Sequence, residues 1–427
     1  MEPQELLDRL NDGDLDARID EVYAVTGPGR DAMRERLAGL VARFAEDFPG
    51  HPAALFTAAG RTEMGGNHTD HQRGQVLAAS VSLDMVACAG ANGGDRIQVR
   101  SEGYPDVVIA LDDLEPDPVE YGTSASLVRG VARAMTERGY KLGGASLRVA
   151  SSVPGGSGLS SSAAYEILIG VTLNHLFCGG RLSSVELAQI GQYAENVFFG
   201  KPSGLMDQLA CAYGGVVHID FADPDAPAIR PIDVDLAGAG YALCIIESGA
   251  DHADLTDEYS AITSEMGAVA ACFGADFLSE VDPAAFWARL AEVRSQAGDR
   301  AVLRAIHFFE DDARVPQLAS ALDARRFDDF LGLVSASGVS SATHLQNLHA
   351  ASDPAQQAVG VTIALAQHLL DGRGAVRVHG GGFAGTVQAY VPLERVDGFV
   401  AGMEAVLGEG RCHVLSIRSV GGGVIAG

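Results

Sequence analysis

The chain has 427 residues, enough for two or three domains, and 47% of them are hydrophobic, enough to form a sizeable core. Its formal net charge is −26, because 56 acidic residues outnumber 30 lysines and arginines. This balance excludes the basic face typical of nucleic-acid-binding proteins and disfavours docking on anionic lipid. A phosphate ligand would therefore have to be held by a local positive field.

Nothing in the sequence predicts export or membrane insertion. The first 20 residues are acidic and amphipathic, so we expect no signal peptide. No run reaches about 18 apolar residues, the length that a transmembrane helix needs. The six cysteines are scattered without a C-x-x-C pair, as is typical of buried thiols in a reducing compartment. We expect a cytoplasmic monomer or weak homodimer with small-molecule ligands and no nucleic-acid or membrane partner.

The predicted elements begin with a helical lead-in arm over residues 1–50, where apolar residues recur at helical spacing. A run of short strands follows, then a helix, a strand and three helices, and two further strands lie before about residue 248, with a Pro/Asp-rich loop predicted between them at 221–235. A domain boundary is placed near 237–248. Residues 255–350 are predicted to be mostly helical. The expected strands lie at 54–60, 75–84, 85–91, 96–102, 106–113, 145–152, 215–221, 242–248, 375–382, 386–392 and 413–418, and the main helices at 31–47, 124–138, 160–176, 184–199 and 204–213.

The strongest local motif is a glycine- and serine-rich loop, residues 153–164, with the sequence VPGGSGLSSSAA. Glycines let several backbone N–H groups point at one anion, and the start of the following helix also favours phosphate. The serines add hydroxyl donors, and Ser162 could reach a metal ion. No Gly-Lys-Ser/Thr follows, so this is not a Walker A loop. The alternative is a glycine-rich hairpin or a flexible loop without a ligand.

Two carboxylates downstream are candidates for chemistry. Glu195, near the end of one predicted helix, is a plausible ligand for Mg²⁺, which prefers carboxylate oxygen. Asp207 lies beside a glycine turn at the start of the next helix, where its side chain can point into a cleft. Taken singly, either residue could equally be a solvated surface group.

A polar segment at 60–71, GRTEMGGNHTDH, is predicted to be a loop that offers hydrogen-bonding groups to a polyol. His68, Asp70 and His71 could also form part of a metal site, but no further ligand follows at metal spacing. A polar loop without function is the remaining alternative.

Together these motifs resemble the GHMP kinase family. Residues 158–164 resemble its phosphate-binding motif, and 376–387 resemble its C-terminal glycine motif. Residues 60–71 are similar to the galactokinase signature GR-x-N-x-I-G-E-H-T-D-Y. Residues 204–208, GLMDQ, are similar to that branch's G-I-M-D-Q, and Asp257-Glu258-Tyr259 resembles its S-E-Y. The resemblance runs from about residue 50 to the C-terminus.

The resemblance implies an α/β (α+β) fold with two lobes and an active site between them. Residues 51–236 would form the N-terminal lobe with a mixed sheet, and residues 237–427 a ferredoxin-like C-terminal lobe. The implied activity is ATP-dependent phosphorylation of a monosaccharide hydroxyl, most directly of galactose to galactose 1-phosphate, with ATP as co-substrate and Mg²⁺ as cofactor.

The resemblance also implies roles for single residues. Asp207 would be the catalytic carboxylate and Arg61 its cationic neighbour, while Ser162 and Glu195 would hold Mg²⁺. The implied sugar contacts are Asn67, His68, Asp70, Gly204 and Tyr259. The implied ATP-binding loop is Gly155, Gly156, Ser157, Gly158, Leu159, Ser160, Ser161 and Ser162.

The chain departs from the signature mainly on the sugar side. Asn67 stands where the signature has glutamate, Glu63 where it has asparagine, and His71 where it has tyrosine. An amide can donate as well as accept, whereas a carboxylate only accepts, so these changes bear on the sugar more than on the reaction. Three alternatives stay open. The first is a kinase of the same family for galactosamine, N-acetylgalactosamine, arabinose or a non-sugar alcohol. The others are a non-catalytic sensor of sugar and ATP and a generic phosphate-binding protein.

Overall fold

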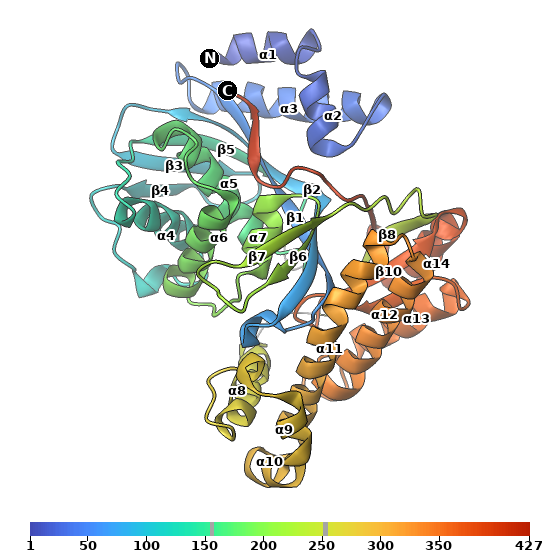
Figure 1. Ribbon diagram of the computed structural model, residues 1–427. Coiled ribbons are helices and arrows are strands. Elements are labelled where there is room, and N and C mark those ends of the chain that lie inside the picture. The colour runs from blue at the N-terminus through green and yellow to red at the C-terminus, as the bar shows by residue number, and fades with distance from the viewer. Residues whose placement is uncertain (154–157, 251–254) are drawn as a thin grey trace.

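The computed structural model describes residues 1–153, 158–250 and 255–427 (Figure 1). Strands from both ends of the chain form an eight-stranded sheet in the order β12-β1-β2-β5-β3-β4, with β6 paired to β2 and β7 paired to β6. Only β3 and β5 run parallel, so the sheet is mixed, as the sequence predicted. Its strands are β1 (Ala54–Gly65), β2 (Gln75–Ala91), β3 (Arg96–Ser101), β4 (Val107–Ala110), β5 (Ala145–Ser151), β6 (Val216–Asp220), β7 (Ala228–Ile232) and β12 (Gly423–Ala426).

Three sequence-based expectations about this sheet were wrong. The runs at 75–84 and 85–91 form the single strand β2, which is nearly all buried. Residues 60–65 continue β1 instead of opening a loop, because their polar side chains find partners inside the protein. The stretch 221–235, expected to be a loop, contains β7. Pro231 is tolerated there because β7 pairs only with β6 and so lies at an edge.

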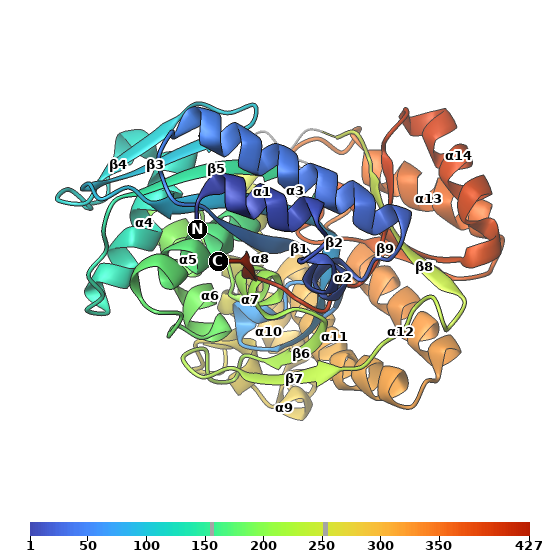
Figure 2. The ribbon, with the colours of Figure 1, turned by 90° about the horizontal axis from the view of Figure 1, so that it is seen from above.

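Helices cover both faces of the sheet (Figures 1 and 2). Alternation along β1 sends Leu55 to one face and Phe56 to the other. The Leu55 side packs against the lead-in arm, and the Phe56 side against the helices that follow β3. The arm comprises α1 (Pro3–Asn11), α2 (Asp16–Tyr23) and α3 (Pro28–Asp47). The second group comprises α4 (Ser124–Glu137), α5 (Ser161–Phe177), α6 (Ser184–Tyr193), which continues as a π-helix (Ala194–Phe199), and α7 (Met206–Tyr213).

A second sheet is antiparallel and has the order β11-β8-β10-β9. Numbered along the chain, this order is 4-1-3-2, and helices α13 (Ala358–Leu370) and α14 (Val396–Leu407) complete a βαββαβ pattern. That arrangement is ferredoxin-like and agrees with the predicted fold class. The strands are β8 (Tyr241–Glu247), β9 (Ala375–Val378), β10 (Thr386–Pro392) and β11 (Cys412–Leu415).

The remaining helices follow β8, and the longest of them, α11, runs beside β1 and β2 of the first sheet and packs against α12, which lies on β9 of the second sheet (Figure 1). One buried core contains residues of both sheets and of α11 and α12, including Val81, Val315, Phe330 and Tyr390, so the two sheet systems share a hydrophobic interior. None of the helices in the described ranges is long and apolar enough to cross a membrane. The remaining helices after β8 are α8 (Thr256–Ala271), α9 (Pro283–Ala288), α10 (Leu290–Ala297), α11 (Asp299–Asp323) and α12 (Phe327–Ser340), which continues as a π-helix (Ser341–Leu345).

Candidate active site

A cavity of about 700 Å³ collects nearly all the described candidate residues. Its wall comes from β1, the segment after it, the start of α5, residues 201–207, α8 and residues 379–386. Sites of this size bind cofactors and small substrates. The candidates on its wall are Arg61, Asn67, His68, Asp70, Gly158, Ser160, Ser161, Ser162, Gly204, Asp207 and Tyr259.

Arg61 of β1 and Asp207 at the start of α7 form a two-pronged ion pair in this cavity. Arg61 Nε lies 2.6 Å from Asp207 Oδ1, and its Nη2 lies 2.9 Å from Oδ2. Burial by itself would raise the pKa of Asp207, but the Arg61 charge and the hydrogen bonds from Arg61 and Ser160 outweigh it and lower the pKa to about 2. Asp207 is therefore a carboxylate at neutral pH.

The predicted phosphate loop is followed directly by α5. Residues Gly155, Gly156 and Ser157 lie outside the described residues, so their predicted ATP contacts stay predictions. Ser160 has φ of 55°, and its hydroxyl donates to Asp207 instead of capping α5. The first-turn N–H groups of α5 thus keep their capacity for an anion.

Neighbouring atoms leave no room for a side chain at position 158, so glycine is required there. The side chain of Leu159, by contrast, belongs to the hydrophobic core. Gly158 has φ of 67°, and a Cβ there would lie 2.5 Å from Thr386 Oγ1, so only glycine lets the loop approach β10. Leu159, which the resemblance placed in the ATP loop, has a fully buried side chain in the core. Any contact of Leu159 with ATP would therefore be made by its backbone.

Ser162 and Glu195, the two predicted Mg²⁺ ligands, lie next to each other. Ser162 Oγ lies 2.8 Å from Glu195 Oε1, and Gln208 Nε2 donates to the other carboxylate oxygen at 2.8 Å. Lys201 Nζ lies 3.0 Å from Glu195 Oε1. Sequence reasoning missed Lys201, although its place between two glycines just before the GLMDQ segment was a signal.

The sugar-side candidates converge from three segments. His68 follows β1 with φ of 60°, and its Nε2 lies 3.0 Å from the Gly381 carbonyl oxygen. Nε2 must donate there, which leaves Nδ1 as the acceptor. Burial lowers the pKa of His68 to about 3, so the ring is neutral at pH 7. Tyr259 donates from its hydroxyl to the Gly382 carbonyl at 3.1 Å.

Gly204 lies against Asp70. A Cβ at position 204 would lie 1.9 Å from Asp70 Oδ2, so glycine is needed for the carboxylate to keep its place. Asp70 itself is nearly buried, with 7% of its side chain exposed, and it faces the cavity.

The alternative metal site at His68, Asp70 and His71 receives no support from the geometry. Within residues 1–153, 158–250 and 255–427, no group of three or more potential ligands is arranged to hold a metal ion. The two imidazoles stack at 5.6 Å between ring centroids, and Nε2 of His68 is occupied by Gly381.

Known proteins share this fold and these motifs. The family described as "GHMP kinases N terminal domain" matches residues 126–215, and the "Galactokinase galactose-binding signature" matches residues 42–91. A Streptomyces coelicolor galactokinase is 31% identical over 383 residues, covering 87% of this chain and 93% of that protein.

Solved structures agree in fold. A Lactococcus lactis galactokinase complexed with galactose superposes with a TM-score of 0.76 at 24% identity, covering 91% of this chain and 99% of that one. A Methanococcus jannaschii mevalonate kinase gives 0.61 at 14% identity, covering 87% and 100%. The fold is that of the GHMP class of small-molecule kinases. Within that class, the chain belongs to the galactokinase family.

Proposed function

We propose that the protein transfers the γ-phosphoryl group of ATP to a monosaccharide hydroxyl, and that the sugar is galactose, which becomes galactose 1-phosphate. The observation that carries this proposal is the Arg61–Asp207 pair, which lies in one cavity with the start of α5 on one side and the His68, Asp70 and Tyr259 side chains on the other. This cavity offers an anion-binding helix start, an ionised carboxylate and a polar wall for a polyol.

In the proposed mechanism, the N–H groups at the start of α5 hold the phosphates, and Asp70 and Tyr259 orient the sugar. Phosphoryl transfer depends on positioning and charge stabilisation more than on covalent chemistry. Asp207 accepts the proton of the attacking hydroxyl. With a pKa of about 2 it is a weak base, so the proton moves late, after most of the bond to the leaving group has broken.

The residues present fit Mg²⁺. Mg²⁺ prefers oxygen ligands and is usually held by one or two carboxylates together with substrate phosphates and water. Ser162 Oγ and Glu195 Oε1 supply two such oxygens 2.8 Å apart. When bound, the ion would neutralise charge on the phosphates. Lys201, which contacts the same Glu195 oxygen, adds a positive charge at this end of the cavity.

The test measures ADP release with ATP and a panel of free sugars: galactose, galactosamine, N-acetylgalactosamine and arabinose. We expect the highest kcat/KM for galactose and a product phosphorylated at its anomeric hydroxyl. A higher kcat/KM for another member would reassign the substrate. Binding of ATP and galactose without any product would identify a sensor and refute the kinase.

A further inference from the structure

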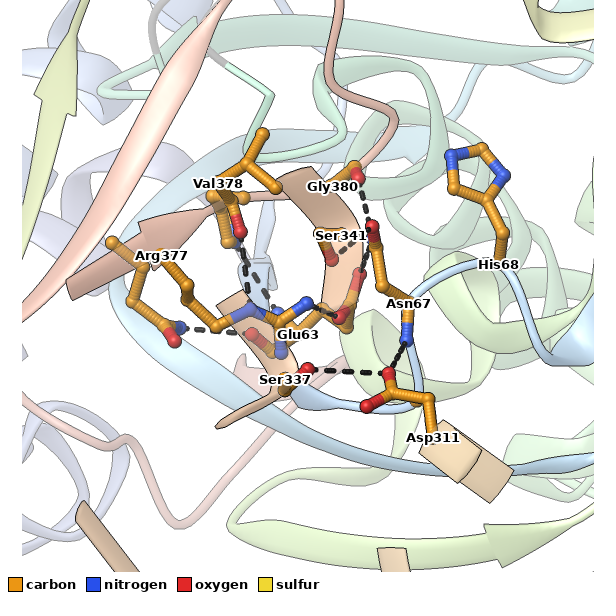
Figure 3. A network of polar contacts seen from close by, with 12 residues as sticks. Glu63, Asn67, His68, Asp311, Ser337, Ser341, Arg377, Val378 and Gly380 are labelled. Atoms are coloured by element: carbon orange, nitrogen blue, oxygen red, sulfur yellow. Dashed lines mark hydrogen bonds and ion pairs between the residues drawn. The ribbon is translucent and has the colours of Figure 1, made fainter. Parts of the chain in front are cut away.

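Behind the sugar end of the cavity, a carboxylate near the end of β1 contacts an amide in the segment that follows this strand (Figure 3). Asn67 Nδ2 donates to Glu63 Oε2 at 2.8 Å, and both side chains are almost fully buried. The other carboxylate oxygen of Glu63 accepts from Nη2 of Arg377 at 2.5 Å. Arg377 lies on β9 and Glu63 on β1, so this buried ion pair joins the two sheets.

The amide of Asn67 has no hydrogen-bonding capacity left for a sugar. Its second N–H donates to the Gly380 carbonyl at 2.7 Å. Its oxygen accepts from Asn347 Nδ2 at 2.9 Å and from Ser341 Oγ at 3.3 Å. An amide offers two donors and one oxygen with two lone pairs, and all are used within the protein. Asn67 was expected to bind the sugar, but both polar atoms of its side chain form hydrogen bonds to other residues of the protein.

The backbone of Asn67 is fixed as well. Its N–H donates to Asp311 Oδ2 at 2.8 Å (Figure 3). Its carbonyl accepts from His307 Nε2 at 2.9 Å. The next residue is His68, whose left-handed backbone needs support from its surroundings. The fixed backbone of Asn67 therefore restrains the backbone of the next residue, His68.

The side chain of Asn67 also restrains the glycine segment, residues 380–382. Three consecutive carbonyls of this segment each accept from a cavity residue: Gly380 from Asn67, Gly381 from His68, and Gly382 from Tyr259. A shift of Asn67 would move the segment on which both His68 and Tyr259 rest. A change at Asn67 would therefore alter the positions of the His68 and Tyr259 side chains, which line the sugar end of the cavity.

The exchange of residue types at these positions is reciprocal. The galactokinase signature has asparagine where this chain has Glu63, and glutamate where it has Asn67. Since the two side chains are in contact, each arrangement contains one carboxylate and one amide. Two carboxylates in contact would repel each other, and two amides would leave the buried Arg377 charge without a counter-ion.

From these contacts we infer that Glu63, Asn67 and Arg377 act as one positioning unit for the sugar site, with the carboxylate moved from position 67 to position 63. Arg377 holds Glu63, Glu63 holds Asn67, and Asn67 fixes His68 and the 380–382 segment. The sugar consequently meets no carboxylate at position 67. This inference rests on the proposed function for its catalytic readout but not for its stability readout.

The test is a double-mutant cycle on the full chain with Glu63→Asn, Asn67→Glu and the double variant. Each single change leaves a buried charge uncompensated, and we expect it to lower the thermal midpoint by about 5 °C. The double variant restores one carboxylate and one amide and should recover more than half of the larger loss. Asp329→Asn, which removes a carboxylate from the exposed Arg326–Asp329 pair, is the matched control and should change the midpoint by about 1 °C or less. Additive losses in the double variant would overturn the inference.

A milder variant tests positioning rather than stability. Glu63→Gln keeps the shape and an acceptor for Arg377 but removes the charge. We expect the KM for galactose to rise about tenfold, with the KM for ATP within about twofold of wild type, since only the sugar wall shifts. Equal rises in both values, or no change in either, would contradict the positioning role. If the wild type phosphorylates no sugar, the proposed function fails, while the stability cycle still decides whether the three residues form a unit.

Discussion

Replacing Asp207 by asparagine tests both the proposed chemical role of this carboxylate and its contribution to stability. Asparagine is nearly the same size and still accepts one hydrogen bond from Arg61, but it cannot take a proton. Removing a positioned general base slows a reaction by about 10²- to 10⁴-fold, and we expect kcat to fall within this range. The measurement is kcat at saturating ATP and galactose, with single-turnover rates to exclude a change in product release.

The stability effect has a sign that can be worked out. A fall in the pKa of Asp207 from its ordinary 3.8 to about 2 corresponds to about 2 kcal/mol of folding free energy. Since the pKa in the folded protein is below that of the unfolded chain, this contribution is fully present above about pH 4 and disappears as the pH falls toward 2. Denaturant unfolding at pH 7 should show Asp207→Asn less stable by about this amount, and the difference should shrink at pH 3.

A companion variant provides the control. Ser160→Ala removes one hydrogen bond to Asp207 but leaves both the carboxylate and Arg61 in place. We expect kcat to fall by less than about tenfold, because one hydrogen bond contributes about 1 kcal/mol. The reasoning would be refuted by an Asp207→Asn enzyme with kcat within about threefold of wild type, or by a Ser160→Ala enzyme that is equally impaired.

Four further predictions concern other parts of the molecule. His68 is neutral because burial lowers its pKa to about 3, so the KM for galactose should stay constant from pH 5 to 8, and a rise below pH 6.5 that disappears in His68→Asn would contradict this. Glu195→Gln should raise the Mg²⁺ concentration for half-maximal rate by about tenfold or more, since Mg²⁺ favours carboxylate ligands; an unchanged Mg²⁺ titration would remove Glu195 from the metal site. Gly204→Ala should displace the Asp70 carboxylate and raise the KM for galactose by at least about tenfold, with little effect on the KM for ATP, as initial-rate kinetics would show. Asp84→Asn should destabilise the protein by about 3–5 kcal/mol in denaturant unfolding without changing either KM, because it leaves two arginines, one from α3 and one from the C-terminal segment, without their counter-ion.

The sequence by itself predicted a phosphate-binding loop, a candidate base and a pair of metal ligands. These features depend on local chemistry. A glycine–serine run before a helix favours an anion wherever the fold places it. Ser162 and Glu195, which were predicted as metal ligands from residue type, lie next to each other in the structure, and their metal role stays a prediction. The mixed sheet and the ferredoxin-like order were implied by the motifs and agree with the fold.

The tertiary structure decided those features that depend on contacts between residues far apart in the sequence. The polar stretch at 60–65 looked like a loop, but it is a buried strand because Arg61 finds Asp207 and Glu63 finds Arg377, 146 and 314 residues away in the chain. Asn67 looked like a sugar ligand, but four protein groups occupy its amide. Pairing over such separations leaves no periodic pattern in the sequence. Only the folded chain shows that Glu63 and Asn67, the two residues that differ from the galactokinase signature at these positions, are in contact with each other.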